Sequence, residues 1–133
     1  MILDDMLSYL NGAPYSLTNV YKHGVPDRAA LPANGLFLTP GPGDVRGMNG
    51  SLVEINRIVC YSRASDPDVA LTQNNVIFAA FLSKNLRAKT ITGSVYLGAE
   101  PVARPYILKV QPDREYYTAT SAVDVSRQGV CNT

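Results

Sequence analysis

Residues that could carry out catalysis are few in this sequence and are far apart. The single histidine is His23, and the two cysteines, Cys60 and Cys131, are separated by 71 positions. A Ser–His–Asp or Cys–His site would have to use His23, and no spacing to Asp4, Asp27 or Cys131 favours one. A zinc site needs about three or four Cys, His or acidic ligands, which this set does not supply. We therefore expect no catalytic residue, no cofactor and no metal site, and a protein that is not an enzyme.

The segment 40–50, PGPGDVRGMNG, contains four glycines and two prolines. A phosphate-binding loop would require Gly-Lys-Ser or Gly-Lys-Thr leading into a helix. This segment instead leads into a predicted strand and contains Asp44 and Arg46. Its composition predicts a mobile loop between two strands. The alternative is a contact loop that becomes ordered on assembly, because loops of this length in a compact domain usually bind something.

The size and charge of the chain limit the classes of function. Its 133 residues fit one domain, and the charged fraction of 17% is below the usual quarter. A low charge suits either a surface covered by partners or a compact monomer. Twelve basic and eleven acidic residues leave a net charge of +1 without a basic run. Non-specific duplex binding is therefore not the expected main function, while weak contact with nucleic acid inside a larger assembly stays open.

Segments that target a chain to membranes are not evident. The N-terminal sequence MILDDMLSYL has two early acids and no basic region, unlike a signal peptide. No apolar run approaches the roughly 18–20 residues of a membrane span. We expect a protein made in a reducing cytoplasm, with Cys60 as a small core residue.

The N-terminal third predicts one helix and two short extended pieces. Leu3, Leu7 and Leu10 follow the spacing of one helical face over residues 2–10. The Asn11-Gly12 pair is a typical helix stop. Short strands are predicted at Val20-Tyr21 and at Leu36–Leu38.

The clearest signal is a long strand, a sharp turn and a long helix between Ser51 and Leu86. Apolar residues alternate onto both faces over residues 51–61, which indicates a central strand with one face partly covered by a partner. Ser65 is the predicted N-cap and Pro67 lies in the first turn of the helix. The helix is expected to run to about Arg87. Its predicted core stripe is Leu71, Phe78 and Leu82, and its predicted solvent side is Gln73, Asn74 and Asn75.

Three further strands are expected after this helix. The first contains Ile91 to Leu97, and the turn Gly98–Pro101 leads to a second around Tyr106 to Val110. The third runs from Tyr116 to Val125, and residues 126–133 are predicted to be a flexible tail outside the domain 1–125. The fold class is therefore α+β, with a short N-terminal helix and one long helix on one face of a mainly antiparallel or mixed sheet of four to five strands.

This order of elements resembles the tail terminator (tail completion) proteins of long-tailed bacteriophages and their minor capsid protein relatives. The match is one of element order and length, over the segments Leu3–Leu10, Leu36–Thr39, Ser51–Tyr61, Val69–Leu86 and Val95–Val125. The resemblance implies a homo-oligomeric ring, commonly a hexamer, in the tail and neck of a virion. Such a ring caps the tail tube, ends its growth and presents a surface to the head–neck connector protein.

No family motif carries residue roles over, so the candidate assembly contacts are inferred from the sequence. They are the loop residues Asp44, Arg46 and Met48 and the polar residues Arg57, Asn74 and Asn75. Two alternatives remain open. One is another neck, head-closure or tail-tube component of the virion, and the other is a small ligand-binding or enzymatic α+β domain with a pocket between helix and sheet.

Overall fold

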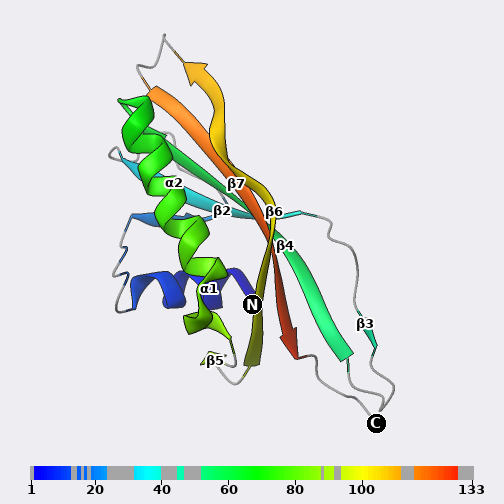
Figure 1. Ribbon diagram of the computed structural model, residues 1–133. Coiled ribbons are helices and arrows are strands. Elements are labelled where there is room, and N and C mark those ends of the chain that lie inside the picture. The colour runs from blue at the N-terminus through cyan, green and yellow to red at the C-terminus, as the bar shows by residue number, and fades with distance from the viewer. Residues whose placement is uncertain are drawn as a thin grey trace.

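The computed structural model describes residues 2–12, 15, 17, 19–23, 32–39, 45–46, 52–87, 89–91, 94–111 and 116–128. They form helices α1 (Ile2–Asn11) and α2 (Pro67–Leu82), a short 3-10 helix η1 (Lys84–Leu86) and seven strands. The strands are β1 (Val20–Lys22), β2 (Ala33–Thr39), β3 (Val45–Arg46), β4 (Leu52–Ala64), β5 (Lys89–Ile91), β6 (Ser94–Gln111) and β7 (Tyr116–Gln128). Both helices lie on one side of a strongly twisted sheet (Figure 1).

The sheet has the strand order β1-β2-β4-β7-β6-β5, and β3 pairs with the beginning of β4. The β1–β2 pair is parallel and the other pairs are antiparallel, so the sheet is mixed. The α+β class is confirmed, whereas the predicted four to five strands are too few. β1, β3 and β5 have only two or three residues each, too few for a periodic pattern to predict with assurance.

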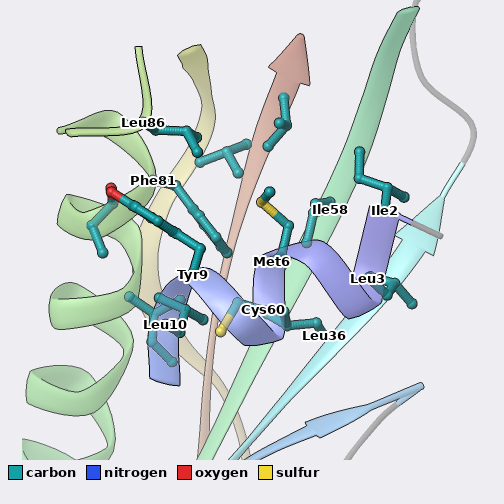
Figure 2. Packing of buried hydrophobic residues seen from close by; sticks show 14 of the residues in the cluster. Ile2, Leu3, Met6, Tyr9, Leu10, Leu36, Ile58, Cys60, Phe81 and Leu86 are labelled. Atoms are coloured by element: carbon teal, nitrogen blue, oxygen red, sulfur yellow. The ribbon is translucent and has the colours of Figure 1, made fainter. Parts of the chain in front are cut away.

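Helix α1 begins and ends where the leucine spacing predicts. Leu3, Met6 and Leu10 are fully buried, and Ile2 and Tyr9 are nearly so. Asp4 and Asp5 lie in the first turn, where carboxylates interact favourably with the helix dipole. Figure 2 shows Met6, Tyr9 and Leu10 pointing from α1 into the space between α2 and the sheet.

Helix α2 differs from its prediction at both ends. Its N-cap is Asp66 rather than Ser65, because the Asp66 carboxylate accepts a 2.8 Å hydrogen bond from the Asp68 backbone N–H. Pro67 occupies the first turn as predicted. The helix ends at Leu82, since Ser83 adopts an extended conformation and caps η1 through its side chain.

Strand β6 is continuous through the segment that predicts a turn. Gly98 takes a φ of 130° and Pro101 pairs in register with Val123, with β-bulges on both sides of this region. β7 flanks β6 along one side, while β5 flanks only its first residues, 94–96, on the other. Proline is tolerated there because an edge strand does not need every backbone N–H for the ladder. The predicted turn at Gly98–Pro101 is therefore wrong.

The last strand also extends further than predicted. β7 continues to Gln128, so Ser126, Arg127 and Gln128 belong to the sheet rather than to the predicted tail. The remaining tail residues, 129–133, are outside the described part of the chain.

The core fills the space between the helices and one face of the sheet. Leu36 from β2, Ile58 and Cys60 from β4, and Val123 and Val125 from β7 are buried there against both helices (Figure 2). Burying each large aliphatic or aromatic side chain contributes roughly 1.5–3 kcal/mol. In the described part of the chain, no helix is long and apolar enough to cross a membrane.

Candidate assembly surface

Three of the predicted contact residues belong to the segment 40–50. Asp44 and Met48 are outside the described residues. Arg46 lies in β3, where its backbone pairs with Leu52 of β4. The two-residue strand means that this segment, predicted to be a structureless loop, is partly held against the sheet.

Arg57 lies on the sheet face opposite the helices. It is the register partner of Asp124, and its guanidinium forms two hydrogen bonds with that carboxylate, of 2.9 Å from Nε and 3.2 Å from Nη2. The carboxylate raises the pKa of Arg57 further above its usual value through this hydrogen bond. The ion pair neutralises both charges on a surface where the neighbouring residues are mostly uncharged.

The two asparagines of α2 have different environments. Asn75 is exposed as predicted, whereas Asn74 has no exposed surface, so the prediction that it lies on the solvent side is wrong. Its Nδ2 donates a 2.9 Å hydrogen bond to Ser62 Oγ and lies 3.3 Å from the Cys60 carbonyl oxygen. The buried stripe of α2 includes one polar residue and consists of Ala70, Asn74, Ile77, Ala80 and Phe81. The predicted core stripe of Leu71, Phe78 and Leu82 is only partly buried, beside this one. Asn74 therefore holds α2 on the sheet inside the subunit.

The sheet face opposite the helices, here called the uncovered face, is formed by alternate residues of β2, β4, β6 and β7. Phe37, Ile55, Val59 and Tyr61 are half-buried on it, and Tyr106 has 49% of its surface exposed. The rings of Phe37 and Tyr61 meet edge to face with centroids 5.3 Å apart. This face contains a hollow of about 160 Å³ lined by Val59, Tyr61, Ala103, Tyr106, Thr120 and Ala122, among others. The alternation in residues 51–61 predicted this apolar second face, but not the aromatic contributions of β2 and β6.

The outward face of α2 also carries few charged side chains. Its exposed residues after Asp68 are Val69, Thr72, Asn75, Val76 and Ala79, which recur every three or four positions. Val69 and Val76 each expose 41% of their surface. No charged residue occurs between Asp68 and Lys84. A solvent-facing helical stripe usually carries charged residues, so a neutral one with two exposed valines suits a protein contact.

The described residues that were considered as candidates for catalysis include Cys60 and His23. Cys60 is buried under α2, and burial raises the pKa of its thiol to about 12. His23 is an exposed residue with a left-handed φ of 63° at the end of β1. Among the described residues, no group of three or more His, Cys, Asp or Glu side chains could hold a metal ion.

A hydrogen bond between two buried polar groups joins α1 to the sheet on the helix-covered face, next to a partly exposed ion pair. The fully buried Tyr96 of β6 donates a 2.5 Å hydrogen bond from its hydroxyl to the Asp5 carboxylate. Its register partner is Arg127, whose Nε donates a 2.6 Å hydrogen bond to Glu54. Burial raises the pKa of Tyr96, and the hydrogen bond to the Asp5 carboxylate raises it further. These contacts fix α1 over the sheet.

Comparison with known proteins identifies the fold but no family. No family model and no curated protein matches the chain. Its structure is similar to a chain in a solved structure described as the virion of a native gene transfer agent (GTA) particle. The TM-score is 0.66 and the sequences are 13% identical, over 95% of this chain and 93% of that chain. At this identity the likeness shows a shared fold along nearly the whole length of both chains.

Proposed function

We propose that this protein is a structural component of a phage-like virion. The observation that carries the proposal is the end-to-end structural likeness to a chain of a gene transfer agent virion. The 95% and 93% coverages mean that the likeness is not limited to a common supersecondary motif. The element order, read from the sequence, independently resembles proteins of phage tails.

Within the virion, the proposed role is that of a tail terminator. The chain forms a ring, of six subunits in our proposal, which caps the tail tube, ends its growth and joins the tail to the head–neck connector. The protein has no catalytic role and is made in the host cytoplasm before it enters the tail and neck. Two different surfaces on opposite sides of the subunit, each with mostly uncharged residues at its centre, support this role, because closed rings need head-to-tail contacts.

Deleting the gene from the genome that encodes this chain tests the role directly. Electron microscopy of the resulting particles is expected to show tails of uncontrolled length without attached heads, and a plasmid copy of the gene should restore normal particles. Full heads that lack tails, next to free tails of normal length, would indicate a head-closure component. Particles without any tail tube would indicate a tube subunit. Normal, infectious or gene-transferring particles would refute a virion role.

A further inference from the structure

A closed ring of more than two subunits requires two different surfaces on each subunit, since each copy contacts one neighbour through one surface and the next neighbour through the other. The chain has two such surfaces, the outward face of α2 and the uncovered face of the sheet. They lie on opposite sides of the subunit, because α2 covers the other face of the same sheet (Figure 1). This inference rests on the proposed ring.

We propose that the outward face of α2 of one copy docks against the uncovered face of the next copy. Each sheet in the ring is then covered on both sides, by its own helices on one face and by the neighbour's α2 on the other. The two exposed valines of α2, Val69 and Val76, lie two helical turns apart and supply apolar side chains for this contact. The hollow lined by Val59, Tyr61 and Tyr106 is the place that receives them.

The uncovered face is long enough to receive α2, because β4 has 13 residues. α2 has 16 residues and is therefore about 24 Å long at 1.5 Å per residue. On the uncovered face, the six residue steps from Arg57 to Arg63 span about 20 Å at roughly 3.3 Å per step. A helix laid along β4 would therefore cover this stretch, which contains Val59 and Tyr61.

The direction of α2 follows from its contacts within the subunit. Ala70, near its start, packs against Ala64 at the end of β4, and Asn74 one turn later reaches Ser62 and Cys60. α2 therefore runs antiparallel to β4, and its N-terminus lies at the Arg63 end of that strand. If neighbouring copies are stacked in similar orientations, the neighbour's α2 also has its N-terminus at the Arg63 end.

The charges favour that orientation. The N-terminal turn of α2 carries the exposed carboxylates of Asp66 and Asp68, and the next charged residue after them is the exposed Lys84 beyond its C-terminus. On the uncovered face, Arg63 marks the end of β4 nearest the start of α2, and it already has an interaction within the subunit. Glu100, the register partner of Asp124, lies toward the other end. Stacking copies in similar orientations thus brings Lys84 toward Glu100 and keeps the acidic start of α2 away from that carboxylate, with neutral residues meeting between them.

Two single substitutions test the contact from its two sides. Val76→Glu places a charge on the outward face of α2, and Tyr106→Glu places one at the hollow of the uncovered face. Both positions are well exposed, at 41% and 49%, and glutamate is a better helix former than valine. The control is Val102→Glu, which changes a residue of β6 with similar exposure (42%) that does not line the hollow. Circular dichroism checks that each variant is folded.

Sedimentation velocity of the full chain over a hundredfold concentration range provides the measurement. We expect the wild type and Val102→Glu to sediment as rings, and each of the other two variants as a monomer with at least tenfold weaker association. An equimolar mixture of Val76→Glu and Tyr106→Glu should sediment as a dimer. In that dimer, the unmodified helix face of one chain meets the unmodified sheet face of the other.

Three results would overturn this arrangement. They are a wild type that stays monomeric throughout, rings that persist in both variants, and a mixture that contains only monomers although each single variant is folded. Failure of the docking arrangement is separable from failure of the proposed function. If both variants form rings and still restore normal particles to a deletion strain, only the docking arrangement is wrong.

Discussion

Replacing Tyr96 by phenylalanine removes one hydroxyl from a fully buried ring and leaves the rest of the side chain in place. In the wild type, that hydroxyl donates a 2.5 Å hydrogen bond to Asp5, a carboxylate with only 4% of its surface exposed. The substitution therefore deprives a buried acceptor of its donor without changing the packing of β6 against α1.

The expected loss of stability follows from the charge of the acceptor. Hydrogen bonds to charged groups contribute about 1.5–3 kcal/mol, and a buried acceptor left unpaired costs at least a similar amount. We expect Tyr96→Phe to lower the free energy of unfolding by roughly 2–3 kcal/mol at pH 7. For a domain of this size, about 2 cal/mol/K of unfolding entropy per residue converts this to a fall in Tm of roughly 7–11 °C.

The effect should depend on pH in a defined direction. The pKa of Tyr96 is raised in the folded protein by burial and by the Asp5 carboxylate. The neutral hydroxyl is therefore favoured by folding, and its contribution is fully present below the unfolded pKa of about 10 and is lost as pH rises above it. Phenylalanine has no proton to lose, so the difference between wild type and variant should shrink above about pH 10.

Urea unfolding followed by circular dichroism measures these differences. The matched control is Tyr106→Phe, which removes a hydroxyl from a tyrosine that is 49% exposed and should leave stability nearly unchanged. In an Asp5→Asn background, Tyr96→Phe should cost about 1 kcal/mol less, because a neutral amide is less costly to leave unpaired. A loss below about 0.5 kcal/mol for Tyr96→Phe, or equal losses in the two backgrounds, would refute this reasoning.

Three further predictions concern other contacts. Asn74→Ala should lower the free energy of unfolding by about 2–3 kcal/mol, because it leaves buried acceptors unpaired and creates a void. Thermal or urea unfolding measures this loss, and a loss below about 0.5 kcal/mol would contradict the role of Asn74 in fixing α2. In a Cys131→Ser background, Cys60 should react with a thiol reagent at pH 8 only after denaturation, because burial raises the pKa of its thiol to about 12. Rapid labelling of the native protein would contradict this prediction. Arg57→Ala should lower Tm less than Asn74→Ala does, because the ion pair between Arg57 and Asp124 is partly exposed. A fall in Tm for Arg57→Ala that equals or exceeds the fall for Asn74→Ala would refute this ranking.

Sequence patterns predicted those parts of the fold where one periodicity dominates. The leucine spacing of residues 2–10 predicts α1 within one residue, because its inward face is uniformly apolar. The alternation over residues 51–61 predicts a two-faced central strand, as observed in β4. The same alternation gave the only sequence signal for the uncovered face.

Where the structure departs from the prediction, tertiary contacts outweigh local preference. Asn74 looks like a surface residue until β4 is seen to supply Ser62 and a backbone carbonyl as acceptors. Gly98 and Pro101 look like a turn, but bulges let β6 pass through them while β7 pairs along its length. The ring of Tyr106 joins Tyr61 at one hollow only because β7 brings β4 and β6 together, which a single strand's pattern does not contain.

The position of β7 has a consequence for how the chain folds during synthesis. β7 is the last strand in the described part of the chain, yet it lies between β4 and β6 in the middle of the sheet. Its pairing with β4 joins residues as far apart as Val53 and Gln128, and such long-range pairing makes folding slow. Neither face of the sheet is complete until residue 128 has left the ribosome. Until then, β4 and β6 of a nascent chain lack the strand that lies between them, and their backbone edges are exposed to non-native pairing.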